Sequence, residues 1–338
     1  MLPFPPIERI VEAVIPRESA GLALLDYLCG RFDYLDRPQW QEQLDLGNLE
    51  LDGVRAGGAE ILRGGEKLFF QALGLVEQEV SWEISVLAET DDYIVVDKPG
   101  NLPCHPAGRF FNHTLWAWLK QVRHLDDIHF VSRIDRETSG IVLVAKNARF
   151  AARAAKQLHA LGLDTRKEYE VLVHGRVPWR AFTAAGWLAP DRNAAVRKKR
   201  RFLHLEDDGV SDSIELPEDD EAVTCQTDFA LQGFCRPPRE GEPPHRFVPD
   251  PQGGFSHLRA VLHTGRTHQI RATLCSLGYP IVGDKLYGLD ERIFLHLAAN
   301  ALTDDDRRRL ILPHQALHAA RLTLPRLYLD LSCPPPFL

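Results

Sequence analysis

The sequence has few of the features that mark secreted, membrane-bound or metal-dependent proteins. Its six cysteines are scattered and form no C-x-x-C pair, so neither a disulfide framework nor a zinc knuckle is predicted. The longest apolar runs, such as Ile141 to Ala145, are far too short to cross a bilayer. The first residues do not have the pattern of a secretion signal. We therefore expect a cytoplasmic protein with reduced thiols and no membrane partner.

The chain also lacks the net positive charge that is usual for proteins that bind nucleic acids. Its formal net charge is −7 over 338 residues. Acidic residues are concentrated up to Glu83 and again from Glu206 to Glu221, and the rest of the C-terminal part is cationic. This distribution permits RNA binding on one face but does not argue for it. We expect the acidic segments to be solvated and repelled from phosphates.

Length and pattern indicate two domains. Residues 1–81 combine helical spacing of apolar residues from Gly21 to Phe32, and a second possible helix around Gln39 to Leu46, with a strand–turn–strand pattern. Residues 82–338 form the second domain. Within it, residues 192–254 are charged and rich in proline, so we expect an irregular insertion there.

Several elements of the second domain can be predicted from their patterns. Gly140 to Ala145 is continuously apolar and predicts a strand that is buried on both faces. A helix is expected from Ala148 to Leu161. The alternation from Lys167 to Val173 predicts a strand with Lys167 and Tyr169 on one side. A further strand from Leu258 to His263 should lead through a glycine turn into a helix from His268 to Leu277 that is capped by Thr267.

The string Arg133-Ile-Asp-Arg-Glu-Thr-Ser-Gly140 precedes the apolar strand and carries a candidate catalytic carboxylate. Arg133 and Arg136 flank Asp135, and nearby cations favour the ionised form of an aspartate. A surface ion pair before a strand is the simpler explanation of such a pattern. The complete string of eight residues shifts the balance towards a functional site.

A second string runs from Leu262 to Arg271 and continues to Gly288. It predicts a glycine turn at a helix N-terminus, where free backbone N–H groups and the helix dipole favour an anion. Arg266, His268 and Arg271 surround that end. Ile270 lies on the same helical face as Leu274, so it could equally be a core residue.

Together these strings resemble the RluA-type family of RNA pseudouridine synthases. The family's motif around its catalytic aspartate is similar to Ser132–Gly140, and its T-G-R-T-H-Q-I-R motif is similar to Thr264–Arg271. The remaining similar strings are Lys98–Gly100, the pair Lys167 and Tyr169, Gly278–Gly288 and Leu317–Ala319. The specific signal is their shared order along the chain.

The resemblance implies an α+β pseudouridine synthase fold, with a mostly antiparallel mixed sheet and a central catalytic cleft. Residues 1–81 resemble a small S4-like RNA-binding domain. The implied enzyme isomerises uridine in ribosomal or transfer RNA. We expect it to be a monomer. Because the reaction is redox-neutral, we expect no cofactor and no metal.

The resemblance also implies roles for individual residues. Asp135 acts either as a nucleophile or as a base that removes a sugar proton, and the residues leave both possibilities open. Arg271 pairs with Asp135, and Tyr169 stacks on the extruded base and assists in removing its C5 proton, although a tyrosine of the sheet core remains an alternative. The implied substrate contacts come from Arg133, Arg136, Arg266, Thr267, His268, Gln269 and Ile270.

Two other functions are compatible with parts of the sequence. One is a non-catalytic RNA-binding or chaperone protein of the same fold, against which the set of Asp135, Tyr169 and Arg271 argues. The other is an unrelated hydrolase with an aspartate nucleophile. Ser132 stands where the family usually has histidine. We expect this difference to alter local packing or RNA contact without abolishing activity.

Overall fold

The computed structural model shows two compact units, each with its own core. It describes residues 2–32, 34–72, 75–159, 165–205, 221–299 and 301–338. One unit comprises residues 1–82 together with 102–126, and the other comprises residues 83–101 together with 127–338. The candidate active-site residues all belong to the second unit.

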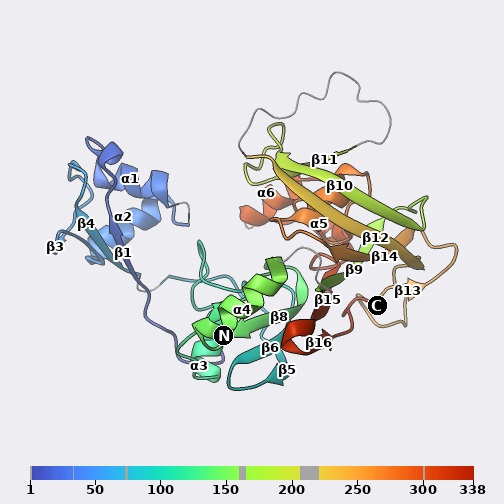
Figure 1. Cartoon of the computed structure of the whole chain (residues 1–338). Coiled ribbons are helices and arrows are strands. Elements are labelled where there is room, and N and C mark those ends of the chain that lie inside the picture. The colour runs from blue at the N-terminus through green and yellow to red at the C-terminus, as the bar shows by residue number, and fades with distance from the viewer. Residues whose placement is uncertain (1, 33, 73–74, 160–164, 206–220, 300) are drawn as a thin grey trace. The chain divides into compact units, whose positions relative to one another are not determined.

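The first unit is built on a small antiparallel sheet with the strand order β1-β4-β2-β3 (Figure 1). Its strands are β1 (Ile10–Val14), β2 (Leu49–Leu51), β3 (Val54–Arg55) and β4 (Lys67–Gln71). Its helices are a 3-10 turn (Arg17–Ser19), α1 (Leu24–Arg31), α2 (Arg37–Leu46) and α3 (Leu115–Val122).

Local sequence signals explain the ends of α2. The Asp36 side chain accepts from the backbone N–H of Gln39, whose own side chain accepts from the backbone of Asp36, so two unpaired donors are satisfied. Gly47 ends the helix in the left-handed conformation, with φ 78°. Trp40 is fully buried in the aromatic core of this unit. The predicted helix at Gln39 therefore exists but begins two residues earlier.

The second unit contains one large sheet, with the order β11-β10-β12-β14-β9-β15-β8-β6-β5 and β7, β13 and β16 paired at its sides. Among the described pairings, β15 with β8 is parallel and the others are antiparallel. The first strands are β5 (Ser85–Glu89), β6 (Tyr93–Lys98), β7 (His129–Phe130), β8 (Ser139–Ala145), β9 (Arg166–His174) and β10 (Ala181–Pro190). The later ones are β11 (Arg200–His204), β12 (Val223–Arg236), β13 (Val248–Pro249), β14 (Phe255–Leu262), β15 (Leu317–Leu324) and β16 (Leu329–Ser332).

Helices pack against both halves of this sheet. Helix α4 (Ala148–His159) contacts β8 and β15, and α5 (Gln269–Ser276) contacts β10 and β11 (Figure 1). The remaining helices are α6 (Arg292–Ala298), α7 (Asp304–Leu310) and a 3-10 turn (Pro325–Leu327). No helix in the described part of the chain combines the length and the hydropathy needed to span a bilayer.

Two sequence predictions about this unit have opposite outcomes. All seven residues of β8 are buried, which confirms the prediction of a strand covered on both faces. The prediction of an irregular insertion at 192–254 is wrong for much of its described part. It contains β11, β13 and β12, a strand of 14 residues that pairs with both β10 and β14. These strands alternate polar and apolar residues and are held by long-range pairing, which the local charge and proline content concealed.

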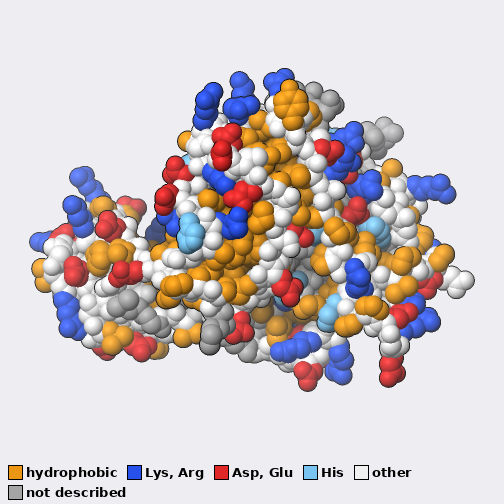
Figure 2. Space-filling model, turned by 90° about the horizontal axis from the view of Figure 1, so that it is seen from below, with side chains coloured by type: hydrophobic (Ala, Val, Ile, Leu, Met, Phe, Trp, Pro, Cys, Tyr) orange, Lys and Arg blue, Asp and Glu red, His pale blue; other side chains and the backbone are white. Residues whose placement is uncertain are grey.

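Charged side chains of both signs are interspersed on the face shown in Figure 2. Several charged side chains of the described residues form ion pairs, such as Arg321 with Asp330 at 2.8 Å. The basic run at 197–201 leads into β11, which begins at Arg200. The predicted acidic block from Glu206 lies outside the described residues, apart from Glu221.

Gly140 on β8 allows a close backbone approach beside the site. It has φ 110°, and a Cβ there would lie 2.6 Å from the backbone nitrogen of Ala319 on β15. We expect Gly140→Ala to destabilise the fold by about 3 kcal/mol, because both the left-handed backbone and the contact are unfavourable. Thermal unfolding checks this. Gly233→Ala is the matched control, since that position has open space, and equal melting temperatures for the two variants would contradict the prediction.

Candidate active site

Asp135 lies in the loop between β7 and β8, at the wall of a cavity of about 70 Å³. Its side chain is 30% exposed, so it is accessible but not fully solvated. The cavity is lined by Arg133, Ile134, Asp135, Thr138, Tyr169, Leu262, Arg266, His268, Gln269, Ile270, Arg271 and Leu317.

Buried polar contacts hold this loop in place. Lys98, which is fully buried, donates through Nζ to the carbonyl oxygen of Arg136 at 3.1 Å. Lys285 donates to a carboxylate oxygen of Glu137 at 2.9 Å and to the carbonyl of Pro313 at 2.6 Å. Lys98 therefore holds the loop backbone at Arg136 and Lys285 holds the side chain of Glu137, and both contacts limit the positions that the Asp135 carboxylate can take.

Arg271 connects Asp135 to a second carboxylate. Its Nη1 donates to Oδ2 of Asp135 at 2.7 Å, while Nε and Nη2 donate to the two oxygens of Asp284 at 2.6 and 2.9 Å. Helix α5 places the guanidinium here, and the ring of Tyr287 lies 4.9 Å from its centre. The guanidinium is thus fixed by a bidentate pair and presents its remaining edge to Asp135.

Asp284 is the buried support of this arrangement, with no exposed side-chain surface. It also accepts from the backbone N–H groups of Leu286 and Tyr287, both at 2.9 Å. Burial alone would raise the pKa of Asp284, but Arg271 and these N–H donors outweigh burial and lower it. Asp284 is therefore an anion inside the protein, and the orientation of Arg271 depends on it.

His268 approaches Asp135 from the other side, with Nε2 4.0 Å from Oδ1. Its Nδ1 lies 2.9 Å from the hydroxyl oxygen of Tyr287, which accepts from the backbone N–H of Arg200 at 2.9 Å. The arrangement that uses every group has Tyr287 donating to Nδ1, which leaves the proton of a neutral imidazole on Nε2. Burial, followed by the charge of Arg271, lowers the pKa of His268 to about 4. His268 is therefore a neutral N–H donor that faces the carboxylate.

The turn before α5 differs from its prediction. The residue at the N-cap is His268 in the left-handed conformation, φ 58°, and no side chain caps the helix, so the predicted cap by Thr267 is wrong. Gln269 organises the turn instead. Its amide oxygen accepts from Thr264 Oγ1 and from the backbone N–H of Arg266, and its amide nitrogen donates to the carbonyl of Gln226 and to a threonine hydroxyl. This amide has no hydrogen-bonding capacity left for RNA. The predicted contact of Gln269 with the substrate is therefore not made by a hydrogen bond of this amide.

Tyr169 lines the cavity of Asp135 and also a larger cavity of about 440 Å³ beside it. The larger cavity is bordered by Ser132 and Lys167 among others, and the two cavities share Arg133, Tyr169, Leu262 and Arg266. Tyr169 and Lys167 lie on the same side of β9, as their alternation predicted. The two cavities therefore adjoin one another along this side of β9.

The structure brings most of the predicted site residues together. Asp135, Tyr169, Arg271, Arg133, Arg266, His268, Gln269 and Ile270 all line the smaller cavity. Arg136 and Thr267 are not among its lining residues: Arg136 lies 3.5 Å from a carboxylate oxygen of Glu137, and Thr267 is exposed. Ile270 is 4% exposed and belongs to the core while also lining the cavity, so its two interpretations are compatible.

Sequence reasoning missed the roles of Asp284 and Tyr287. Both lie within the string Gly278–Gly288, whose resemblance to the family implies no role for its individual members. An aspartate three residues before a tyrosine gives no sign that both will contact Arg271. That contact depends on how the chain after α5 folds back on the helix.

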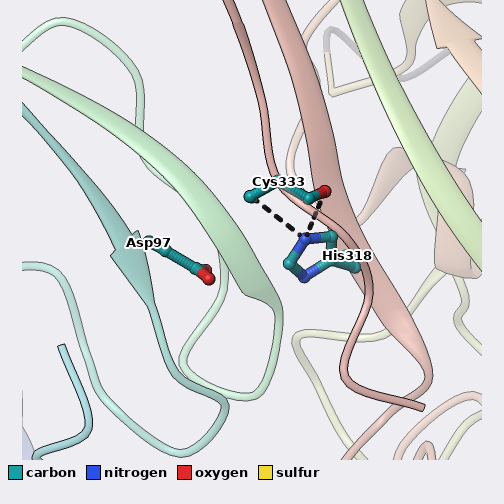
Figure 3. Close-up of side chains that lie close together, drawn as sticks. All are labelled: Asp97, His318 and Cys333. Carbon is teal, nitrogen blue, oxygen red and sulfur yellow. Dashed lines mark hydrogen bonds between the residues drawn. The ribbon is translucent and has the colours of Figure 1, made fainter. Parts of the chain in front are cut away.

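One group in the described part of the chain has the donors for a metal ion. Asp97 on β6, His318 on β15 and Cys333 place their ligand atoms within 4.8 Å of one another, and Figure 3 shows the Asp97 side chain pointing towards the other two. Both ring nitrogens of His318 already have partners: Nδ1 lies 2.8 Å from Ser139 Oγ, and Nε2 lies 3.2 Å from the sulfur and the carbonyl oxygen of Cys333. These hydrogen bonds account for the cluster as buried polar packing that ties β15 to the C-terminal segment.

Comparison with known proteins assigns the family. The family model described as RNA pseudouridylate synthase matches residues 92–276, which include Asp135, Tyr169 and Arg271. The chain belongs to the RNA pseudouridine synthase family. It is accordingly an RNA-modifying isomerase of the RluA type, as the resemblance implied.

Individual relatives agree with this assignment. The chain is 28% identical to the ribosomal large subunit pseudouridine synthase D of Pseudomonas aeruginosa over 94% of this chain and 88% of the relative. It is 25% identical to the mitochondrial tRNA pseudouridine(32) synthase of Saccharomyces cerevisiae over 79% of this chain and 51% of that protein. The solved structure of human RNA pseudouridylate synthase domain containing 1 shares the fold, with a TM-score of 0.54, 20% identity, and coverage of 78% of this chain and 88% of that chain.

The lowered pKa of His268 predicts a loss of stability in acid. The unfolded chain binds a proton at this histidine near pH 6.5, whereas the folded protein does so only near pH 4, so stability is full above pH 6.5 and falls as the pH is lowered towards 4. At pH 5 this effect is about 2 kcal/mol. We expect His268→Asn, which tolerates the left-handed backbone, to lose less stability than the wild type between pH 7.5 and pH 5.

The measurement is chemical or thermal unfolding at the two pH values. His245→Asn is the matched control, because His245 is exposed and also left-handed, with φ 64°. An identical acid response in the wild type and His268→Asn would show that His268 is not held neutral in the folded protein.

Proposed function

We propose that this enzyme isomerises specific uridines in ribosomal or transfer RNA, with Asp135 as the carboxylate that reacts at the sugar. The observation that carries the proposal is the position of Asp135 at the wall of a cavity, fixed through Nη1 of Arg271 at 2.7 Å. A carboxylate that is oriented, half-buried and paired with a fixed cation is suited to act on a bound nucleotide.

The reaction needs no oxidant and no external group. The bond between uracil N1 and ribose C1′ breaks, the base turns, and a bond forms between C5 and C1′. The proton on C5 leaves and N1 gains a proton, so atoms and electrons balance. Asp135 supports this in one of two ways: its oxygen bonds to C1′ as the uracil departs, or it removes a proton from the sugar.

The position of Asp135 at the wall of a cavity supports a flipped base. A nucleotide stacked within an RNA helix could not bring its C1′ to a carboxylate at the wall of this cavity, so the target nucleotide must leave its stack. Tyr169 offers an aromatic ring for the extruded uracil, and Ile270 offers an apolar surface. Arg133, which is exposed at the same cavity, has the reach to occupy the space that the nucleotide leaves.

The neutral N–H of His268 adds a second donor beside Asp135. It can donate to a sugar oxygen of the bound nucleotide without adding positive charge next to Arg271. Arg266 is exposed and lines the same cavity, and its Nε donates to the carbonyl of Thr224 at 3.1 Å. These contacts support binding of a polyanionic substrate.

The names of the relatives guide the choice of RNA. The relative that is matched over nearly all of both chains is named for the large ribosomal subunit, and the yeast relative is named for transfer RNA. We place ribosomal RNA first for this reason. Residues 1–81 are proposed to be an S4-like domain in front of a catalytic domain at 82–338, and the enzyme to act as a monomer. Two helices combined with a small antiparallel sheet support the S4-like assignment.

The decisive variant is Asp135→Asn, which keeps the shape of the side chain and removes its charge. We expect the wild type to release tritium from RNA labelled at uracil C5, and Asp135→Asn to release it at least about 10⁴-fold more slowly, because the group that reacts at the sugar is lost. Asp127→Asn changes an exposed aspartate of the same unit and should retain full activity. A folded Asp135→Asn with normal release would overturn the proposal. A wild type that binds RNA but releases nothing would favour the non-catalytic alternative.

Tyr169→Phe separates stacking from proton removal. If the phenol assists in removing the C5 proton, kcat for tritium release should fall about 100-fold while KM changes little, because the ring that stacks is retained. Tyr169→Leu should raise KM as well, since the aromatic surface is lost. Unchanged kcat in Tyr169→Phe would restrict this residue to stacking.

A further inference from the structure

Lys167 is a cation of the larger cavity that the proposed reaction does not use. Its side chain is partly buried on β9 and lines the cavity of about 440 Å³ together with Tyr169. Within the described ranges, no hydrogen bond or ion pair to the side chain of Lys167 is found. Burial lowers the pKa of its ammonium, and no neighbouring charge contributes to the shift. An ammonium that is withdrawn from water without a partner is costly, so a ligand that supplies negative charge would be bound favourably.

The opposite face of the same strand provides a contrast. Glu168 lies 3.9 Å from nitrogens of Arg166 and Arg259, and Glu170 contacts Arg259 at 3.4 Å and His257 at 2.5 Å. Charges on that face are therefore paired within the protein. The ammonium of Lys167 on the cavity face has no such partner among the described residues, although Lys167 directly precedes Glu168 in the chain. The difference places the unsatisfied charge on the face towards the active site.

The turn after β14 leaves space for this ammonium. A Cβ on Gly265 would lie 3.2 Å from Nζ of Lys167. Gly265 does not have a left-handed backbone, so its conformation does not require glycine. The missing side chain instead allows the turn from Thr264 to Thr267 to pass close to the ammonium of Lys167, which lines the cavity together with Gly265.

We propose that Lys167 binds a backbone phosphate of the substrate RNA next to the uridine that reaches Asp135. This inference rests on the proposed function and adds a subsite to it. The two cavities share four lining residues, among them Tyr169 and Arg133, so an occupant of one is a neighbour of the other. A ribose joins the flipped base to its phosphates, and a nucleotide in the smaller cavity must carry a phosphate away from it. A compact ammonium is a suitable point charge for a phosphodiester oxygen.

The phosphodiester is favoured over other anions by the surroundings. His263 at the cavity already contacts Asp228 at 2.6 Å, and the remaining wall combines apolar side chains such as Leu158 and Leu262 with the aromatic ring of Tyr169. Arg133 and Arg266 line the same cavity, and a site that combines cations with an aromatic ring is suited to single-stranded RNA, which supplies alternating phosphates and bases.

The test measures how RNA binding depends on salt. Lys167→Met keeps the length of the side chain and removes its charge. With uridine-containing single-stranded RNA as the binding probe, we expect Kd to rise about 10-fold at low salt, and the slope of log Kd against log KCl to become shallower by about 0.7, the value for one lost phosphate contact. A purely structural role for Lys167 would not change that slope. With RNA labelled at uracil C5, KM should rise by a similar factor while kcat remains nearly unchanged.

Three further variants make the result specific. Lys167→Arg retains the charge and should keep the wild-type slope. Arg259→Met removes one cation from the opposite face of the same sheet, where it is paired with glutamates, and should also keep the wild-type slope. Gly265→Ala should weaken binding without lowering the melting temperature, because its Cβ displaces the ammonium.

The outcomes separate this inference from the proposed function. A wild-type slope in a folded Lys167→Met overturns the phosphate subsite, even if the enzyme releases tritium normally. A shallower slope in Lys167→Met that is restored in Lys167→Arg supports the subsite, even if no tritium is released and the proposed activity fails. If Lys167→Met does not fold, Gly265→Ala decides the question through its Kd for RNA and its melting temperature. Weaker binding at an unchanged melting temperature supports the subsite, and wild-type binding overturns it.

Discussion

The site depends on a single guanidinium that is held between two carboxylates of different accessibility. Asp284 is fully buried and takes two bonds from Arg271, whereas Asp135 is partly exposed and takes one. A buried aspartate is stable only when its oxygens are satisfied, and here Arg271 and two backbone N–H groups satisfy them. Because the inner pair fixes the guanidinium, the outer bond sets the direction of the Asp135 carboxylate. The chemistry of the cavity therefore depends on an ion pair whose carboxylate, Asp284, is fully buried.

Features that depend only on neighbouring residues in the sequence could be predicted. β8 is apolar at every position, and the alternation along β9 puts Lys167 and Tyr169 on one side. The strings around Asp135 and Arg271 are each continuous, so their members remain together in any fold that retains the loops. Resemblance to a family supplied what local patterns could not, namely that these two strings, more than 120 residues apart, meet at one cavity.

Features that depend on distant pairing could not be predicted. β12 was hidden within a charged segment because its two partner strands lie before and after it in the chain. The amide of Gln269 was interpreted as a contact to RNA, yet it is used entirely by the turn and by β12. Thr267 has the composition of a cap, but the left-handed backbone of His268 turns the chain so that the cap does not form. In each case a tertiary contact overrode a local preference.

The charged residues on the two faces of β9 serve different purposes: those on one face are paired within the protein, and the one on the other face is not paired with any described residue. On one face, each glutamate has a cation within 4 Å, which offsets the cost of their partial burial. On the other face, Lys167 is partly buried with no partner in the described part of the chain, and the cavity beside it adjoins Asp135. A protein selected only for stability would pair or replace that ammonium, because an unpaired charge lowers the free energy of unfolding. Its position is understandable if the missing partner is a substrate anion, in which case the cost in the free enzyme becomes binding free energy when RNA arrives.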